Sequence, residues 1–189
     1  MFCGSSSGAN PIYREAAEAM GQAIAQRGYG LVYGGGKVGL MGKVADTVMA
    51  AGGEAIGVIP AFLEAKEIAH PNLTQLHVVN SMHERKALMA NLADSFVAMP
   101  GGYGTLEEFC EVLTWSQLGL HQKPMGLLNV AGYYDALLTL FDRAVTDRFL
   151  QPELRAIVLE ADQPNTLLDQ MATYQPTKVE KWIREENET

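Results

Sequence analysis

Cysteine is scarce in this sequence of 189 residues, and its histidines are not clustered. The two cysteines, Cys3 and Cys110, lie far apart in the chain and form no C-x-x-C pattern. Unpaired thiols are typical of a reducing compartment, so we expect a cytoplasmic protein. The four histidines show no spacing typical of metal ligands, and we therefore expect neither a metal nor another cofactor.

The sequence also has few positively charged residues and lacks long apolar runs. Lys and Arg number 14 against 22 Asp and Glu, which gives a net charge of −8 and an isoelectric point near 5.0. Such a balance argues against nucleic acid as a main partner. No apolar run approaches the roughly 20 residues of a membrane-spanning helix, and the first residues show no signal-peptide pattern. We therefore expect no membrane partner either.

What the sequence does contain is a regular alternation of short apolar runs with helical segments. Strands are expected at residues 31–33, 55–59, 76–79, 96–99, 125–128 and 157–159. Helices are expected at residues 11–27, 40–51, 82–93, 105–120, 134–147 and 166–172. This alternation predicts an α/β fold, with a doubly wound parallel sheet flanked by helices on both faces. The length favours a single domain over residues 1–189, with a peripheral tail from about residue 176.

Two segments do not fit this alternation. Residues 61–72 form the longest irregular connection, which could act as a lid. At the start, only three residues precede a turn-rich loop and a helix that Asn10 caps and Pro11 opens. Since a full strand should precede such a loop, we expect a first strand that is either very short or lacks its first residues.

Three loops that follow strands and lead into helices are rich in glycine or hydroxyl groups. They are residues 3–8, 34–42 and 100–105. In a parallel sheet they open at the same edge, where ligands bind beyond the carboxyl ends of the strands. A single loop of this kind is most often only a tight turn, but three converging loops predict an anion site of nucleotide size.

The third loop carries the strongest signal, because residues 100–108 read P-G-G-Y-G-T-L-E-E directly after a buried strand. Its glycines let backbone N–H groups approach a ligand, and the helix N-terminus that follows favours a phosphate. Glu107 and Glu108 are expected in the first helical turn. They could do chemistry there, or Glu108 could form a capping box with Thr105 and only stabilise the helix. The ring of Tyr103 could stack on a base or simply cover the loop.

The second loop contains Gly34, Gly36 and Gly39 in the G-x-G-x-x-G spacing of dinucleotide-binding proteins. That motif needs an acid at the end of the next strand to hold the ribose hydroxyls. The next strand ends without one, since Glu54 lies at its beginning. The sequence therefore disfavours a dinucleotide site, and the P-loop pattern is absent.

Another helix brings two cations to the same edge. Arg85 and Lys86 lie in its first turns, after a capping box formed by Ser81 and Glu84. Cations at a helix N-terminus oppose the macrodipole, so this placement favours an external anion over a solvent-facing pair. Met82 could line an apolar pocket, although core filling is the commoner use of methionine.

Together these motifs resemble the Lonely Guy (LOG) family of cytokinin riboside 5′-monophosphate phosphoribohydrolases, which are often mislabelled lysine decarboxylases. Residues 100–108 match the P-G-G-x-G-T-x-x-E signature of that family. The chain is also similar to the family at residues 3–6, at residues 33–42 and at the M-x-x-R-K pattern of residues 82–86. The similarity is collinear from Phe2 to about Leu159.

The resemblance implies a Rossmann-like fold and a homodimer or higher homo-oligomer. It also implies hydrolysis of the N-glycosidic bond of a 6-substituted adenosine 5′-monophosphate, with Arg85 and Glu108 as the catalytic pair. The glycine loops and the resemblance together assign substrate or phosphate binding to Gly4, Ser5, Gly34, Gly35, Glu67, Met82, Lys86, Gly101, Gly102, Tyr103, Gly104, Thr105, Glu107 and Thr114.

Other functions stay open at this stage. A broader nucleosidase acting on AMP or other nucleotides would use the same groups, because base specificity depends on pocket shape. A non-catalytic nucleotide or cofactor carrier would need the glycines but not Arg85 or Glu108. A pyridoxal-phosphate decarboxylase is disfavoured, since no lysine is marked as a Schiff-base residue with a partner for the pyridine nitrogen.

Overall fold

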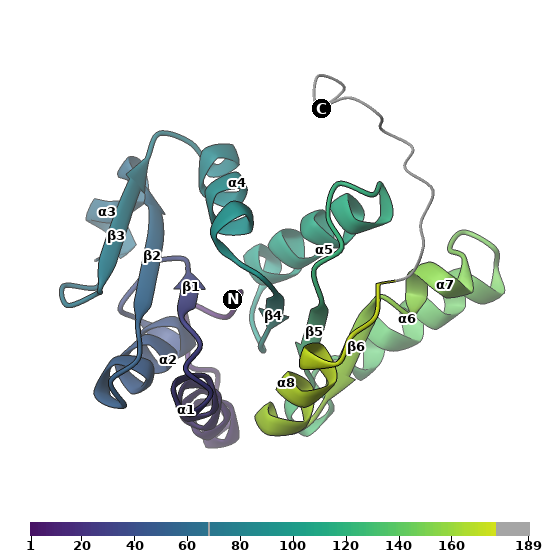
Figure 1. Cartoon of the computed structure of the whole chain (residues 1–189), viewed down its shortest axis with the longest axis horizontal. Helices are drawn as coiled ribbons and strands as arrows, with labels where there is room; N and C mark the ends of the chain where they lie inside the picture. The colour runs from purple at the N-terminus through teal and green to yellow at the C-terminus, as the bar shows by residue number, and fades with distance from the viewer. Residues whose placement is uncertain (68, 177–189) are drawn as a thin grey trace.

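The computed structural model describes residues 1–67 and 69–176, in which parallel strands alternate with helices (Figure 1). The strands are β1 (Leu31–Tyr33), β2 (Ala55–Pro60), β3 (Gln75–Val79), β4 (Phe96–Ala98), β5 (Met125–Leu128) and β6 (Val158–Ala161). The helices are α1 (Pro11–Gln26), α2 (Gly39–Ala50), α3 (Ala61–Glu67), α4 (Met82–Leu92), α5 (Tyr103–Gln117), α6 (Asp135–Thr146), α7 (Pro152–Arg155) and α8 (Pro164–Ala172), with a 3₁₀ turn η1 (Val130–Gly132).

The strands form two parallel sheets of three, in the orders β1-β2-β3 and β4-β5-β6, and residues 1–4 lie between them. The Phe2 N–H donates to the Val97 carbonyl at 2.8 Å, and the Met99 N–H donates to the Phe2 carbonyl at 2.9 Å. On the other side, the Met1 amino group lies 2.5 Å from the Val32 carbonyl oxygen. The first strand is thus very short, a single bridge between Phe2 and Ala98.

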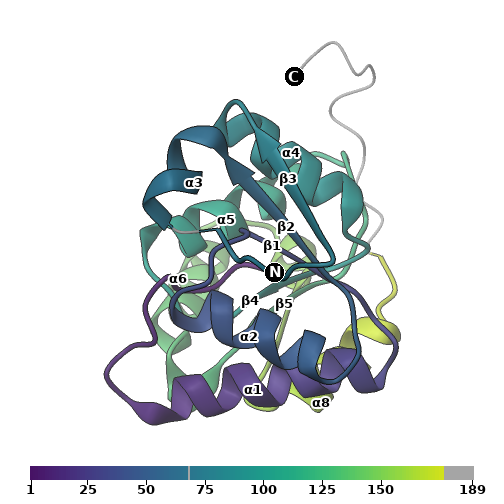
Figure 2. The same ribbon diagram turned by 90° about the vertical axis from the view of Figure 1, so that its left-hand side faces the viewer.

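Apolar side chains fill both faces of this arrangement, which confirms the doubly wound α/β fold. On one face, α1, α2 and α8 pack around Met20, Val44 and Leu167. On the other face, α4, α5 and α6 pack around Met89, Phe109 and Leu138. The two views show α1, α2 and α8 together on one side and α4 and α5 on the other (Figures 1 and 2). The chain winds outward in both directions from residues 1–4, which places the topological switch point next to β4.

Where Asn10 caps α1, the helix begins as that residue predicts. The Asn10 side chain accepts a hydrogen bond from the Ile12 N–H at 3.1 Å, so the predicted cap of α1 is confirmed. Residues 61–72, in contrast, are not irregular throughout, because α3 begins directly after β2. Its residues have high helix propensity, but no Ser, Thr, Asp or Asn caps its start. The short α7 was also missed, although Pro152 at its first position is a start signal.

None of the helices built from residues 1–67 and 69–176 combines the length and apolarity that a bilayer crossing requires.

Candidate active site

The three predicted loops meet at the carboxyl ends of the central strands, and Gly4 joins them. Its N–H donates to the Pro100 carbonyl at 3.0 Å, and its own carbonyl accepts from the Leu40 N–H at 3.0 Å. Gly39 lies so close to the first loop that a Cβ there would be 2.3 Å from the carbonyl carbon of Ser5. The expected convergence of the loops is therefore present in the fold.

The N-terminus of α2 is closed by the chain itself. The N–H groups of Leu40 and Met41 both donate to the Gly4 carbonyl, at 3.0 and 3.4 Å. The Gly35 carbonyl accepts from the His70 N–H at 2.9 Å, which ties the G-x-G-x-x-G loop to the segment after α3. Because a pyrophosphate would need those first amides, this loop is not arranged for a dinucleotide.

The N-terminus of α5 is open by comparison. The N-cap is Gly102, which has no side chain to accept a hydrogen bond from the first turn. The first N–H groups of a helix have no carbonyl within the helix to bind, so those of Tyr103, Gly104 and Thr105 are suited to an anion. A Cβ at Gly102 or Gly104 would meet nothing within 4 Å, and Tyr103 is 93% exposed, so its ring does not cover the loop.

The helix begins two residues earlier than predicted, and this changes the position of the two acids. Thr105 is the third residue of α5, not its cap, and its buried side chain lies under Gly101. The capping box of Thr105 and Glu108 is therefore wrong. Glu107 and Glu108 lie in the second turn, and the first turn contains no acid. The low helix propensity of glycine explains why the sequence placed the start beyond Gly104.

Arg85 is buried and anchored on the backbone of β2 and of the residue directly after β1. Its Nε donates to the Val58 carbonyl at 3.1 Å, and Nη2 donates to the Gly34 carbonyl at 3.3 Å. Nη1 lies 3.8 Å from the sulfur of Met82 and 3.5 Å from Oε1 of Glu108. Only 8% of the Arg85 side chain is exposed, so the solvent-facing alternative is excluded.

Glu108 is the buried partner in that ion pair. Burial raises the pKa of its carboxyl above the ordinary value, and the Arg85 guanidinium offsets part of the increase. A carboxyl group with a raised pKa beside a cation is a common arrangement for acid–base chemistry.

Lys86 binds two further carboxylates of α5. Its Nζ lies 2.6 Å from Oε1 of Glu107 and 2.9 Å from Oε2 of Glu111. Burial acts to lower the pKa of the ammonium, but the two nearby carboxylates more than offset this effect, so the pKa is raised. The sequence reasoning missed Glu111, although its spacing of four residues from Glu107 puts both acids on one helix face.

These five residues, which we call the acid–base cluster, are Arg85, Lys86, Glu107, Glu108 and Glu111. With three carboxylates and two cations, the cluster is formally negative. Arg85 and Lys86 both already face carboxylates of the chain, and their binding of an external anion stays a prediction.

Other predicted residues are less closely connected to the cluster. Thr114 continues the Glu107–Glu111 face of α5, but it is exposed and its hydroxyl donates to the Cys110 carbonyl at 2.8 Å. Ser5 is exposed within the first loop. The side chain of Glu67 lies outside the described residues, as does the charged C-terminal tail at 177–189.

The two thiols are not placed as nucleophiles. Burial raises the pKa of Cys3 to about 12 and also raises that of Cys110. Among the residues that the structure describes, no group of three or more His, Cys, Asp or Glu side chains could hold a metal ion.

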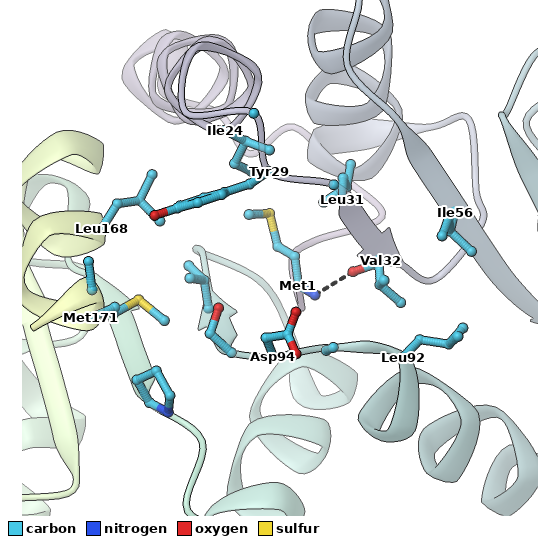
Figure 3. A pocket seen from close by; sticks show the side chains of 17 residues that line it. Met1, Ile24, Tyr29, Leu31, Val32, Ile56, Leu92, Asp94, Leu168 and Met171 are labelled. Carbon is cyan, nitrogen blue, oxygen red and sulfur yellow. Dashed lines mark hydrogen bonds between the residues drawn. The ribbon is translucent and has the colours of Figure 1, made fainter. Parts of the chain in front are cut away.

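A cavity of about 500 Å³ lies at the opposite, amino-terminal ends of β1 and β4 (Figure 3). Its walls include Tyr29, Leu31, Asp94 and Met171, and none of the predicted site residues. In doubly wound sheets, ligands bind at the carboxyl ends of the strands, so this cavity is not the candidate active site.

A substitution at Gly34 tests whether the Arg85 guanidinium is packed directly against the backbone. A Cβ at Gly34 would lie 2.1 Å from Nη2 of Arg85, whereas one at Gly30, at the other end of β1, would meet nothing within 4 Å. We expect Gly34→Ala to lower the free energy of unfolding by about 1–3 kcal/mol through overpacking. Denaturant unfolding measures this loss, and a crystal structure of the variant should show a displaced guanidinium.

Gly30→Ala is the matched control and should leave the free energy of unfolding nearly unchanged or slightly raised. Equal stability of the two variants would mean that Arg85 is not held against Gly34.

Sequence comparison connects this geometry to known proteins. A family model described as "Possible lysine decarboxylase" matches residues 41–171. "Cytokinin riboside 5'-monophosphate phosphoribohydrolase LOG7" of Arabidopsis thaliana is 51% identical over 176 residues, which cover 93% of this chain and 81% of the plant protein. "Probable cytokinin riboside 5'-monophosphate phosphoribohydrolase LOGL9" of Oryza sativa subsp. japonica is also 51% identical, over 93% of this chain and 78% of that protein.

Solved structures share the fold at lower identity. The molybdenum cofactor binding protein of Rippkaea orientalis has a TM-score of 0.64 and 23% identity, over 90% of this chain and 93% of that one. The molybdenum cofactor carrier protein of Chlamydomonas reinhardtii has a TM-score of 0.62 and 21% identity, over 86% and 89% of the two chains. These likenesses show the fold alone. Half of the residues, however, are identical to those of LOG proteins over most of the chain, and the protein belongs to the LOG family of cytokinin riboside 5′-monophosphate phosphoribohydrolases.

Proposed function

We propose that this protein hydrolyses the N-glycosidic bond of a 6-substituted adenosine 5′-monophosphate, releasing the free base and ribose 5-phosphate. The observation that carries the proposal is one helix, α5, with two distinct features. Its N-terminus offers unblocked backbone amides, and its second turn holds the buried pair of Glu108 and Arg85. The two features are separated by about 8 Å along the axis at 1.5 Å per residue, a distance that a ribose 5-phosphate can bridge.

In this proposal the phosphate binds the backbone, not the cationic side chains. The amides of Gly102, Tyr103, Gly104 and Thr105 supply the hydrogen bonds, and the helix dipole favours the negative charge. Lys86 and Arg85 are already paired with carboxylates, so they are poorly available to a phosphate. Their role is to hold the acids in place beside the sugar.

The negative cluster suits the reaction at the sugar. When the bond from C1′ to the base breaks, the electron pair leaves with the base, which takes up a proton, and positive charge develops on the ribose. Glu108 stabilises that charge as a carboxylate and orients the water whose oxygen bonds to C1′; the proton that this water loses balances the one that the base takes up. Arg85 fixes the position of the carboxylate. Such positioning contributes several kcal/mol to lowering the barrier, on the order of 7–11 at best.

The family resemblance also supports a homodimer or higher homo-oligomer, and the unpaired thiols of Cys3 and Cys110 support a cytoplasmic location; we include both in the proposal. A nucleotide or cofactor carrier on the same fold is the alternative from a different class. A carrier would use the open α5 N-terminus, but it would not need a buried carboxyl group with a raised pKa.

The substrate assay separates these functions. The protein is incubated with AMP and with isopentenyl-AMP, and free base and ribose 5-phosphate are measured by chromatography. We expect both products from isopentenyl-AMP in equal amounts. Faster release from AMP would favour a broader nucleosidase, whereas binding without release of either product would contradict the enzyme and favour the carrier.

Glu108→Gln tests the catalytic role directly. The variant keeps the shape and a hydrogen-bond acceptor for Arg85 but removes the charge, so we expect kcat/KM to fall by about 10²- to 10⁴-fold. Glu107→Gln is the matched control, since Glu107 contacts Lys86 at a more exposed position. The kcat/KM of this variant should fall by less than tenfold. Steady-state kinetics of both variants give the comparison, and full base release by Glu108→Gln would rule the assignment out.

The raised pKa of Glu108 fixes the sign of two pH effects. Activity should fall as the pH falls through that pKa, at a pH above the ordinary glutamate value of 4.5. Because the pKa of Glu108 is higher in the folded than in the unfolded state, ionisation of its carboxyl group lowers the stability of the protein as the pH rises through these pKa values. Glu108→Gln should therefore be at least as stable as the parent protein at neutral pH, by thermal unfolding.

A further inference from the structure

The hydroxyl groups of two neighbouring tyrosines donate hydrogen bonds to backbone carbonyls at the P-G-G loop. The Tyr133 hydroxyl donates to the Gly101 carbonyl at 2.5 Å, and the Tyr134 hydroxyl donates to the Met99 carbonyl at 2.7 Å. Between them, the Pro100 carbonyl accepts from Gly4. Three consecutive carbonyls of the loop are thus bound by groups from two distant parts of the chain.

A specific turn between β5 and α6 delivers the two hydroxyls. Its first residue, Asn129, accepts the Tyr134 N–H at 2.7 Å and donates to Oδ1 of Asp135 at 2.7 Å. Ala131 has a φ of 52°, a left-handed conformation that costs energy for any residue with a Cβ. A turn that maintains this conformation is held by its surroundings, so the directions of both tyrosines are well defined.

The rings are also fixed by aromatic contacts. Tyr133 meets Tyr134 edge to face at a centroid distance of 5.1 Å, and it meets Tyr13 of α1 in the same way at 5.7 Å. Tyr134 is fully buried, whereas Tyr133 is 42% exposed. Tyr133 therefore reaches the loop from the solvent side of the site, where its hydroxyl can be removed with little effect on the core.

The planarity of the peptide bond gives these contacts a consequence for ligand binding. In a trans peptide, the carbonyl of one residue and the N–H of the next point in opposite directions. A donor on the Gly101 carbonyl therefore fixes the direction of the Gly102 N–H. In the same way, the hydrogen bond from Gly4 to Pro100 fixes the Gly101 N–H.

We propose that Tyr133 is a positioning residue, whose hydroxyl turns the Gly102 amide toward the phosphate of the substrate. This inference rests on the proposed function, because it assigns the phosphate to the N-terminus of α5. Tyr133 does not touch the reacting atoms. It preorganises a backbone donor, which stabilises the bound substrate and the transition state equally.

Tyr133→Phe tests the proposal, because it removes one oxygen atom and keeps the ring. Uniform loss of binding raises KM and leaves kcat unchanged. We expect KM for the nucleotide and Kd for ribose 5-phosphate to rise about three- to tenfold, as for the loss of one hydrogen bond. We expect kcat to change less than twofold and the midpoint of thermal unfolding to stay nearly constant.

Tyr29→Phe is the matched control, since Tyr29 is 46% exposed and lies by the cavity at the other end of the strands (Figure 3). It should leave KM and Kd unchanged. The NMR order parameter of the Gly102 N–H vector in the ligand-free protein adds a measurement that needs no turnover, and it should be lower in Tyr133→Phe.

The outcomes separate this inference from the proposed function. If the parent protein releases no base, the proposed function fails, and the order parameter of the Gly102 N–H still decides whether Tyr133 orients the loop. If Tyr133→Phe matches the parent protein in KM, Kd and the order parameter of the Gly102 N–H, Tyr133 is not a positioning residue, whatever the activity. A fall in kcat with KM unchanged would also overturn the inference.

Discussion

The hydrogen bonds of Gly4 are the constraint on which the candidate active site depends. Its carbonyl binds the first amides of α2, and its N–H binds the carbonyl of Pro100 before α5. A Cβ on this residue would lie 2.9 Å from the Ser6 carbonyl oxygen and 3.3 Å from that of Pro100, so the close approach requires glycine. One residue thereby closes the N-terminus of one helix and orients the loop before another. Two glycine-rich loops of similar sequence therefore differ in whether the first amides of the following helix are already bound by the chain.

Burial of charge between α4 and α5 provides the second half of the site. Arg85 and Lys86 lie near the start of α4, where cations oppose the helix dipole, and the carboxylates of α5 compensate for that cost. The same pairing leaves the cluster formally negative. In the proposed mechanism, the phosphate therefore binds the α5 backbone amides, and Glu108 stabilises the positive charge that develops on the ribose. This division explains how one helix can bind an anion and stabilise a cation within two turns.

Much of this arrangement could be predicted from the sequence. The α/β alternation, the cap at Asn10 and the edge where the loops meet all follow from local patterns, and the structure confirms them. The start of α5 could not be predicted, because Gly102 and Gly104 have low helix propensity and hide the first turn. The closure of α2 by Gly4 depends on a contact between residues 36 positions apart, Gly4 and Leu40, which no local pattern contains. The hydroxyl contacts of Tyr133 and Tyr134 span 32 and 35 positions and are equally invisible in the sequence.

In the proposed mechanism, the phosphate of the substrate binds the N-terminus of α5 and not that of α2. A crystal structure with ribose 5-phosphate tests this most directly. We expect phosphate oxygens about 3 Å from the amide nitrogens of Gly102, Tyr103, Gly104 and Thr105, with C1′ directed toward Glu108. A phosphate bound at the first turn of α2, or held only by the side chains of Arg85 and Lys86, would contradict it.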